Sequence, residues 1–535
     1  MIDEINASRM QTKDKKRNWR KSLDSEVAIR LQNVTKRFGD IIANDNVNLL
    51  VKKGEILSIL GENGSGKTTL MNMLSGIYFP DHGDITVHGK KVTIRSPKDA
   101  FALGIGMIHQ HFKLIDVLTA AENIILGLPG NESLDMKSIV AEINELVAKY
   151  GFDLDPEQKI YDMSVSQKQT VEIVKVLYRG AEILILDEPT AVLTPQETSK
   201  LFDVLRNMRK AGKSIIIITH KLNEVMELSD RVTVLRKGQY IGSVETSDAS
   251  IDLLTEMMVG QKIDLEIDRT EPLPFVGRIE VKNITCRNRD GVAILKDVSF
   301  TSSAGEILGI AGIAGSGQKE LLEAIAGLQE IESGEILYHS PEGETVTISD
   351  MKAADIRDLK ISLAFVPEDR LGMGLVGSMD LTDNIMLRSY NEGKHFFANR
   401  KNPRKLATRI VEKLSVVTPS VDTPVRKLSG GNVQKILLGR EIASSPNVLM
   451  VAYPVRGLDI NSSYMIYNLL GDQKQKGASV ICVGEDLDVL MALCDRIVVL
   501  SGGELTGIVD ARTISKEAIG LLMTSSKKGG AQHAE

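Results

Sequence analysis

The segment GENGSGKT, residues 61–68, contains the residue types that can wrap around a phosphate group. It follows the short apolar run ILSIL (56–60), which is typical of a buried strand, and it precedes a segment expected to be helical. Its glycines allow backbone N–H groups to approach a phosphate closely at a helix N-terminus. Lys67 would place a positive charge at the β- and γ-phosphates, and the Thr68 hydroxyl would bind Mg²⁺. The spacing therefore predicts a loop that binds a nucleoside triphosphate.

A second apolar run, ILILD (183–187), ends in two neighbouring carboxylates, Asp187 and Glu188. Asp187 would hold the metal through the water molecules around it, since Mg²⁺ usually keeps several of its waters. Glu188 would polarise an attacking water molecule as a general base. A single Asp after a strand often marks only a charged turn. Two carboxylates downstream of a phosphate loop favour hydrolysis of the triphosphate.

Two stretches of the chain repeat the same order of strand, glycine-rich turn, helix and further alternating strands and helices. GEILSILGENGSGKTTLMNMLSG (54–76) has a counterpart in GEILGIAGIAGSGQKELLEAIAG (305–327), and SDRVTVLRKG (229–238) has one in CDRIVVLSGG (494–503). Alternating strands and helices of this kind predict an α/β fold with a parallel-sheet core. The chain is therefore expected to contain two copies of one domain.

The expected domain boundaries come from composition. A flexible basic tail is expected over 1–24, a first domain over 25–260, a linker with two prolines and mixed charge over 261–276, a second domain over 277–526, and a flexible tail over 527–535.

The composition of the 535 residues excludes several classes of protein. Hydrophobic residues make up 42% and charged residues 25%, values that are typical of a globular chain and not of a disordered one. The net charge of −6 does not favour a general nucleic-acid binder. The three cysteines form no C-x-x-C pair, which fits a reducing compartment. No apolar run approaches the roughly 18 residues that a bilayer span needs. We expect a protein that is soluble or held at a membrane only by partners.

These motifs resemble those of the ATP-binding-cassette ATPases, from about residue 27 to 525. The resemblance implies that Gln110 senses Mg²⁺ and links the site to a transport partner, and that His220 contacts the γ-phosphate. It implies that Phe38 stacks on adenine and that LSGGN (428–432) is the signature that closes over ATP bound to the opposite domain. The residues implied to bind ATP are Phe38, Gly61, Glu62, Asn63, Gly64, Ser65, Gly66, Lys67, Thr68, Thr69, Ser429, Gly430, Gly431 and Asn432. Those implied to hold the metal are Thr68, Gln110 and Asp187, and those implied to be catalytic are Glu188, His220 and Gln110.

The two copies differ at the positions that carry the chemistry. The second loop, GIAGSGQK (312–319), keeps Gly315 and Gly317 but has Gln318 in place of the lysine and Lys319 in place of the hydroxyl. The run VLMVAYPV (448–455) places Ala452 and Tyr453 opposite the two carboxylates, and Glu485 replaces His220. Conversely, the first copy has MSVSQ (163–167) where the second has LSGGN.

In the family that the chain resembles, two cassettes stack head to tail, so each ATP lies between the loop of one domain and the signature of the other. The intact parts then all fall at one site, which joins the first loop to the second signature. Loss of one electrostatic or acid–base group costs about 10²–10³ in rate, and the other site lacks several. We therefore expect one hydrolytic site per polypeptide, and a second site that lacks turnover, with nucleotide binding there left open.

Two cassettes in one chain resemble the ATPase subunits of bacterial sugar and nucleoside importers. The segments GIAGSGQ, DMSVSQKQ and CDRIVVLSGG look most like the nucleoside branch. The resemblance implies ATP and Mg²⁺ as cofactors, two transmembrane permease subunits and an extracellular substrate-binding lipoprotein as partners, and no nucleic acid. It also implies a peripheral location at the cytoplasmic face of the cell membrane, with helical subdomains at roughly 90–170 and 345–430 that contact the permeases.

Three other functions stay open. The first is the ATPase of a ribose- or galactoside-type sugar importer. The second is a soluble tandem cassette that acts on ribosomes as a translation factor, against which stand the acidic balance, the absence of a long charged linker and Tyr453 at the second base position. The third is a regulatory ATP-binding module, against which stands the complete first site.

Overall fold

The computed structural model describes residues 26–525 except 110–111, 129–134, 263–266, 268, 272, 289, 366–373, 391–398, 457 and 485. Both expected tails, 1–24 and 527–535, lie outside the described residues. The chain divides into two compact units, and the division in sequence falls between residues 263 and 264, within the segment expected as a linker. Each unit contains one copy of the duplicated pattern.

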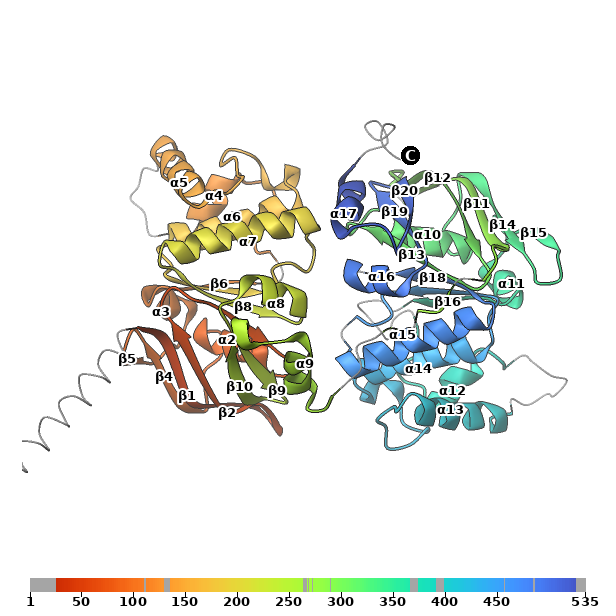
Figure 1. Ribbon diagram of the computed structural model, residues 1–535, viewed down its shortest axis with the longest axis horizontal. Coiled ribbons are helices and arrows are strands. Elements are labelled where there is room, and N and C mark those ends of the chain that lie inside the picture. The colour runs from red at the N-terminus through yellow and green to blue at the C-terminus, as the bar shows by residue number, and fades with distance from the viewer. Residues whose placement is uncertain are drawn as a thin grey trace, which may run out of the picture. The chain divides into compact units, whose positions relative to one another are not determined.

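The first unit contains two sheets (Figure 1). The four-stranded sheet is antiparallel and has the order β2-β1-β4-β5. Its strands are β1 (Val27–Phe38), β2 (Ile41–Lys52), β4 (His82–Val87) and β5 (Lys90–Val92). The six-stranded sheet has the order β10-β9-β3-β8-β7-β6 and is parallel apart from its β10 edge. Its strands are β3 (Ile56–Leu60), β6 (Ile105–Ile108), β7 (Ile183–Asp187), β8 (Ser214–Thr219), β9 (Arg231–Arg236) and β10 (Gln239–Glu245).

Every residue of β3 and β8 is buried, which explains why these strands are continuous apolar runs in the sequence. The helices of the first unit are α2 (Lys67–Leu74), α3 (Pro97–Ala102), α4 (Ala120–Ile125), α5 (Met136–Tyr150), α6 (Val165–Tyr178), α7 (Pro195–Lys210), α8 (Leu222–Leu228) and α9 (Ile251–Val259). Helices α4–α6 share a small apolar core around Ile124, Ile143 and Val171. They lie at the opposite end of the unit from the four-stranded sheet (Figure 1).

The second unit repeats this arrangement. Its six-stranded sheet, β20-β19-β13-β18-β17-β16, has the same strand order as the first, and its four-stranded sheet has the order β12-β11-β14-β15. The strands are β11 (Gly277–Arg287), β12 (Ala293–Ser303), β13 (Glu306–Gly312), β14 (Ser333–His339), β15 (Thr345–Thr347), β16 (Ile361–Phe365), β17 (Val448–Ala452), β18 (Ser479–Val483), β19 (Arg496–Ser501) and β20 (Glu504–Asp510). The expectation of a duplicated α/β fold with parallel-sheet cores is confirmed.

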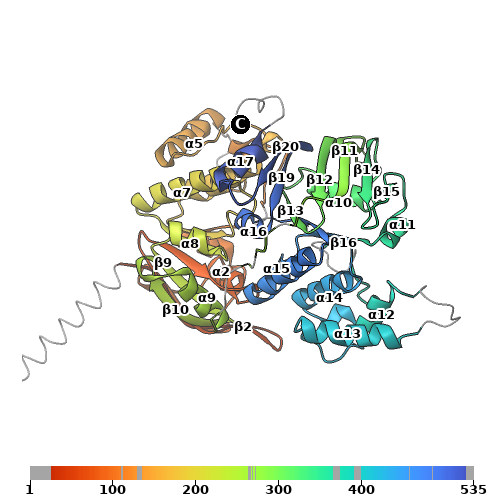
Figure 2. The same cartoon turned by 45° about the vertical axis from the view of Figure 1, so that its right-hand side comes forward.

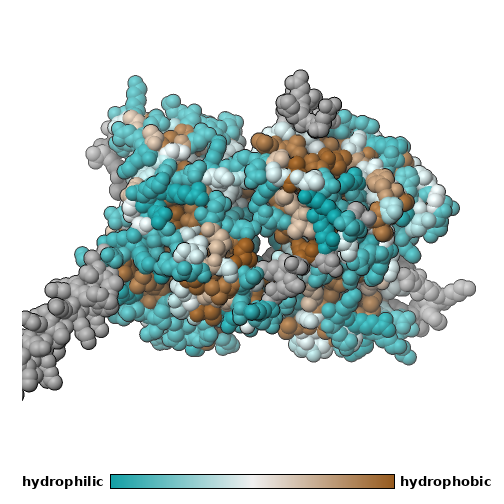
Figure 3. Space-filling model, in the orientation of Figure 1, coloured by the Kyte–Doolittle hydropathy of each residue, from teal (hydrophilic) through white to brown (hydrophobic). Residues whose placement is uncertain are grey.

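The helices of the second unit are α10 (Gln318–Ile325), α11 (Ala353–Asp358), α12 (Leu381–Met386), α13 (Lys401–Lys413), α14 (Gly430–Ala443), α15 (Ile460–Gln475), α16 (Leu487–Leu493) and α17 (Lys516–Thr524). Helices α12–α14 form a separate group at the end of the unit away from the four-stranded sheet (Figure 2). No helix in the described ranges has both the length and the hydrophobicity that crossing a bilayer requires. The face seen in Figure 3 carries mainly hydrophilic side chains, with apolar areas scattered among them.

The second half of the expected linker packs against the second unit. We call its described residues, 269–271 and 273–276, the anchored segment. Lys474 Nζ donates to the carbonyl of Thr270 (2.5 Å) and to Asp495 Oδ1 (2.8 Å). The Arg269 guanidinium donates to the carbonyl of Met491 (2.9 Å), and Arg512 pairs with the Glu271 carboxylate. The ion pair between Lys474 and Asp495 is buried, so this end of the expected linker is part of the packed structure.

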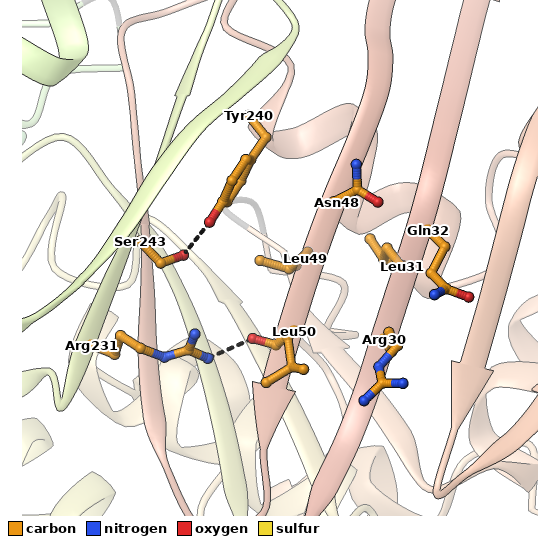
Figure 4. Close-up of a pocket in the computed structure, with 9 residues that line it drawn as sticks. All are labelled: Arg30, Leu31, Gln32, Asn48, Leu49, Leu50, Arg231, Tyr240 and Ser243. Atoms are coloured by element: carbon orange, nitrogen blue, oxygen red, sulfur yellow. Dashed lines mark hydrogen bonds between the residues drawn. The ribbon is translucent and has the colours of Figure 1, made fainter. Parts of the chain in front are cut away.

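A pocket in the first unit lies between strands β1–β2 and the hairpin β9–β10 (Figure 4). The Tyr240 hydroxyl donates to Ser243 Oγ (3.2 Å), and the Arg231 guanidinium donates to the carbonyl of Leu50 (2.5 Å). Arg231 also forms a buried ion pair with Glu55 (2.8 Å). None of the lining residues belongs to the phosphate loop, so this pocket is not the predicted nucleotide site.

Candidate functional site

The loop over residues 61–66 joins β3 to α2, as predicted, and two of its glycines are required by close packing. A Cβ at Gly61 would lie 2.3 Å from the carbonyl oxygen of Leu235. Gly66 has a left-handed φ of 93°, and a Cβ there would lie 2.4 Å from the carbonyl oxygen of Ala43. Any side chain at these positions would clash with backbone, so glycine alone permits this loop. The loop leads directly into α2, where backbone N–H groups favour an anion.

Lys67 is the first residue of α2, and its side chain folds over the loop. Its Nζ donates to the carbonyl oxygens of Gly61 (2.7 Å) and Glu62 (2.9 Å), and the residue is only 6% exposed. Burial lowers the pKa of Lys67, although the charges of Glu188, Asp187 and Glu62 act in the opposite direction. The ammonium is thus held against the loop, where a bound phosphate group would lie.

The hydroxyl of Thr68 and the carboxylate of Asp187 meet although 119 positions separate them in the sequence. Thr68 Oγ1 donates to Asp187 Oδ2 (3.3 Å), because α2 and the end of β7 lie side by side at one edge of the sheet. Burial and the neighbouring charge of Glu188 raise the pKa of Asp187. A hydroxyl and a carboxylate oxygen in contact are the donors that Mg²⁺ takes from proteins when phosphate and water oxygens complete its shell. These residues therefore fit the metal.

The described residues contain no group of three or more His, Cys, Asp or Glu side chains that could hold a metal ion. A metal at this edge of the sheet would therefore depend on phosphate and water oxygens as well as on protein ligands. Gln110, the third predicted metal residue, lies outside the described residues.

Glu188 and His220 are in direct contact: Glu188 Oε1 and His220 Nδ1 are 3.0 Å apart. The backbone of Glu188 adopts a left-handed φ of 47°, which is uncommon for a residue with a side chain, and its N–H donates to the carbonyl of Ile218 (2.9 Å). Burial raises the pKa of Glu188, but the hydrogen bond to His220 and the charges of His220, Lys67 and Lys221 outweigh it and leave that pKa below its ordinary value. Glu188 is therefore ionised at neutral pH, as a general base must be.

The other predicted residues of the first copy lie around this centre. Phe38, at the end of β1, is 43% exposed and packs edge-on against Tyr78 at 5.1 Å, and the Lys36 ammonium lies over its ring at 5.5 Å. Ser65 is buried, and its Oγ has no hydrogen-bond partner among the described residues. Glu62, Asn63, Gly64 and Thr69 belong to the same loop or to the first turn of α2.

Sequence reasoning missed Asn44, a fully buried residue of β2 beneath the loop. Its Nδ2 donates to the carbonyl of Gly66 (3.2 Å), whereas its Oδ1 has no partner among the described residues. The aligned residue of the second unit is Leu295, which is also fully buried and contacts the second loop at Gly317. A polar residue at a buried strand position, where the other copy has leucine, was the signal for this residue.

The signature of the second unit leaves the start of its helix uncapped. Ser429 directly precedes α14, and its side chain accepts no hydrogen bond from the backbone of that helix. Asn432 Nδ2 donates to Ser429 Oγ (2.9 Å), and Asn432 Oδ1 accepts from the backbone N–H of Val417 (3.0 Å). Ser429 is exposed, and Gly430 and Gly431 form the first turn. The backbone N–H groups there are available to an external anion.

In the first unit, by contrast, the corresponding side chains satisfy one another. Ser164 Oγ accepts from the backbone N–H of Gln167 (3.2 Å), and Gln167 Oε1 accepts from the backbone N–H of Ser164 (2.9 Å). This reciprocal arrangement is a capping box, and it uses the hydroxyl and two of the N–H groups that a phosphate would need.

The second copy of the loop has the predicted substitutions. Gln318 stands at the start of α10 and donates through Nε2 to the carbonyl of Ile313 (3.0 Å). Lys319 pairs with Glu323 (3.6 Å), Ala452 ends β17, and Tyr453 follows it with a left-handed φ of 52°. Glu485 lies outside the described residues. Among the residues that are described, no carboxylate occupies the positions of Asp187 and Glu188 in this unit.

In the first unit, the lysine and hydroxyl of a phosphate loop converge with two carboxylates and a histidine that lie at the ends of neighbouring strands. The second unit has the same strand order. These features define a tandem P-loop nucleoside triphosphatase. A model of the ABC transporter family matches residues 44–191 and 295–454, one match in each unit. The chain belongs to this family, and it is an ATPase.

Relatives match along nearly the whole chain. The nucleoside import ATP-binding protein NupA of Lactococcus lactis is 42% identical over 93% of this chain and 98% of its own length. The guanosine import ATP-binding protein NupO of Bacillus subtilis is 41% identical over 94% of this chain and 98% of its own. The ribose import ATP-binding protein RbsA 1 of Rubrobacter xylanophilus is 37% identical over 94% and 98%.

Among solved structures, an archaeal ribosome recycling factor in complex with a ribosomal stalk protein covers 90% of this chain and 90% of its own. Its TM-score is 0.59 and its sequence identity is 16%. At this identity the likeness shows the fold alone.

Proposed function

We propose that the chain is the ATP-hydrolysing subunit of an ABC importer for a nucleoside, with one hydrolytic site per polypeptide. The observation that carries the single site is the convergence of Lys67, Thr68, Asp187, Glu188 and His220 in the first unit. The relatives named for nucleoside and guanosine import, at 42% and 41% identity over more than nine-tenths of the chain, support the direction of transport and the class of solute.

In the proposed reaction, Lys67 binds the β- and γ-phosphates of ATP, and Thr68 and Asp187 hold Mg²⁺. When bound, Mg²⁺ supplies positive charge to the phosphate oxygens. The Glu188 carboxylate accepts a proton from a water molecule as the water oxygen bonds to the γ-phosphorus and the bond to the ADP oxygen breaks. His220, 3.0 Å from that carboxylate, fixes its orientation and contacts the γ-phosphate. The products are ADP and inorganic phosphate.

The second unit would complete this site through its signature. Ser429 is exposed and held by Asn432, and the first turn of α14 carries Gly430 and Gly431 with their N–H groups uncapped by Ser429. These donors suit the γ-phosphate of an ATP molecule bound at the first loop. The capping box of Ser164 and Gln167 in the first unit removes the equivalent donors from the other site. This contrast supports the head-to-tail pairing of the family.

The partners that we propose are two transmembrane permeases and an extracellular substrate-binding lipoprotein, with the chain at the cytoplasmic face of the membrane. The groups α4–α6 and α12–α14 would supply the contacts with the permeases. In the first group, the exposed apolar side chains of Val117 (68%) and Tyr161 (60%) lie on neighbouring segments, because the Tyr161 N–H donates to the carbonyl of Asp116 (3.1 Å). ATP binding would close the two units, and hydrolysis with product release would reopen them.

A test of the solute and the partners uses the native membrane. Deletion of the chain should abolish uptake of radiolabelled nucleosides and leave uptake of ribose and galactosides intact. The wild-type chain should copurify with two hydrophobic permeases. Loss of sugar uptake alone would assign the chain to sugar import, the alternative that the ribose relative supports. Copurification with ribosomes in place of permeases would contradict import.

A further inference from the structure

The second phosphate loop keeps the shape of the first although its side chains differ. Gly315 and Gly317 have φ values of 86° and 98°, as Gly64 and Gly66 have 79° and 93°. Gln318 Nε2 donates to the carbonyl of Ile313, as Lys67 Nζ donates to the aligned carbonyl of Glu62. The backbone N–H groups are therefore arranged alike. Independently of the loop geometry, the ABC transporter family match over residues 295–454 points to a nucleotide as the ligand of this unit.

Magnesium does not fit the second loop. Lys319 occupies the position of the Thr68 hydroxyl, and the buried Ala452 occupies that of the Asp187 carboxylate. Tyr453 shares the backbone conformation of Glu188, since its N–H donates to the carbonyl of Val483 (2.9 Å), and it thus places a phenol where the first unit has a base. The two oxygen ligands of the first site are replaced by an ammonium and a methyl group, and an ammonium repels a metal cation.

The replacements also change the local charge. The first loop faces the carboxylates of Asp187 and Glu188, which disfavour a polyphosphate unless a metal cation is present. At the second loop, Lys319 lies in the first turn of α10, and the Arg456 guanidinium stacks on the Tyr453 ring at 5.8 Å, where the first unit has Ala191. The acidic side chains of α10 near this loop are Glu320, which directly follows Lys319, and Glu323, which lies one helical turn beyond Lys319 and is paired with it at 3.6 Å. Two cationic side chains thus lie where the first unit has a hydroxyl and an alanine, and the two carboxylates that oppose a polyphosphate at the first loop are replaced by Ala452 and Tyr453.

We propose that the second loop binds a nucleoside triphosphate without a metal ion, and that the Lys319 ammonium supplies the charge that Mg²⁺ supplies at the first loop. Lys319 leaves Glu323 and pairs with the phosphates, and the backbone N–H groups after Gly315 and Gly317 bind the remaining oxygens. Such a nucleotide is held without turnover, because among the described residues Ala452 and Tyr453 stand where the first unit has Asp187 and Glu188. The inference rests on the proposed single hydrolytic site and extends it to the other loop.

The test measures binding of radiolabelled ATP to the full chain in excess EDTA. Lys67→Ala weakens the first loop, so the ATP that remains bound to this variant reports on the second. This binding should persist in EDTA. In the Lys67→Ala background, Lys319→Ala should weaken it about 10- to 100-fold, the range for a charged hydrogen bond. Lys319→Gln, which keeps the length of the side chain, should weaken it similarly. Glu323→Gln should strengthen it, because one carboxylate that competes for Lys319 is then removed.

The matched control is Lys476→Ala, at an exposed lysine directly after α15, and it should leave ATP binding unchanged. A second readout counts the metal: at saturation, the wild-type chain should bind two nucleotides but one Mn²⁺. Complete loss of ATP from Lys67→Ala in EDTA, an unchanged affinity in both Lys319 variants, or one Mn²⁺ per nucleotide would overturn the proposal. These results are distinct from failure of the proposed function, which would appear as hydrolysis that survives in Lys67→Ala.

Discussion

Helices α6 and α14 begin at the same position of the duplicated fold, but their first turns are completed differently. In α6, Ser164 and Gln167 satisfy each other in a capping box, whereas Ser429 before α14 caps nothing and is held by Asn432. A capping residue stabilises a helix by about 1 kcal/mol, and each glycine in a helix costs about as much. The MSVSQ segment is therefore the more stable helix start, and LSGGN is the one whose first N–H groups are left uncapped by its serine.

The two phosphate loops also share a backbone shape and differ in their side chains. Gln318 makes the contact with the loop carbonyl that Lys67 makes, so the shape of the loop does not require lysine. What the glutamine lacks is charge. The comparison separates the two tasks of Lys67: the second unit has the loop shape of the first, but it lacks the residue types of Lys67, Thr68, Asp187 and Glu188.

The largest expected effect tests where cleavage occurs. Glu188→Gln should lower the rate of phosphate release by at least about 10²–10³, because the amide cannot accept the proton, while ATP binding is retained. Tyr453→Ala, at the aligned position of the second unit, should keep the rate within about threefold of wild type. The measurement is phosphate release by the chain assembled with its permeases. Equal losses in the two variants would show that both sites do chemistry.

The next effect sharpens the comparison of the two signatures. Ser429→Arg should slow hydrolysis about 10- to 100-fold, because it removes one phosphate donor and blocks the start of α14. Ser164→Arg, the same change at the start of α6, should slow it much less, since that hydroxyl is already used within its own helix. The ratio of the two rates is the measured quantity. A ratio near one would contradict the assignment of the second signature to the first loop.

The third prediction concerns stability, for which Ser164 should matter more than Ser429, the opposite of their expected effects on hydrolysis. Ser164→Ala should lower the free energy of unfolding by about 1 kcal/mol because it breaks the capping box. Ser429→Ala should change it by less than about 0.5 kcal/mol, since this serine accepts no backbone hydrogen bond from its helix and its contact with the Asn432 side chain is exposed. Urea unfolding followed by circular dichroism measures both. Greater destabilisation by Ser429→Ala would mean that the uncapped start of α14 is a structural element.

The smallest effect concerns Asn44. Asn44→Leu copies the residue of the second unit and removes the hydrogen bond to the Gly66 carbonyl together with an unpaired buried oxygen. Removal of an unpaired polar group is nearly neutral for stability, so the change should appear in function. We expect the KM for ATP to rise about threefold with kcat little changed, the signature of weaker ground-state binding. An unchanged KM together with a higher melting temperature would make Asn44 a mere packing defect.

The strands and loops of both units could be predicted because their signals are local. The apolar runs ILSIL and ILILD became buried strands β3 and β7, and the glycine spacing fixed the loop between β3 and α2. Thr68 and Asp187 were each expected at the metal from their own motifs, and the structure places the two side chains in contact. The capping box at Ser164 could also be predicted, since S-x-x-Q is typical of a helix start. In the comparison of the two copies, MSVSQ was interpreted only as the segment that stands where the second copy has LSGGN.

Other features could not be predicted because their partners are distant in the sequence. The residues around Thr270 do not indicate that its carbonyl accepts a hydrogen bond from Lys474, which is 204 positions away in the sequence. The two prolines and mixed charges of 261–276 are typical of a linker, and the composition says nothing of long-range contacts. The left-handed backbone of Glu188 and its contact with His220 likewise depend on how β7 and β8 end side by side.

The anchored segment has a practical consequence for work on the isolated halves. Residue 277 is the start of β11, the first strand of the second unit. In a fragment that begins there, the buried ammonium of Lys474 would keep its contact with Asp495 but lose the carbonyl of Thr270. It would also take from Arg512 its exposed carboxylate partner. Expression trials of the C-terminal half should therefore use a fragment that begins upstream of residue 267, so that it includes the anchored segment and its contacts with Lys474 and Arg512.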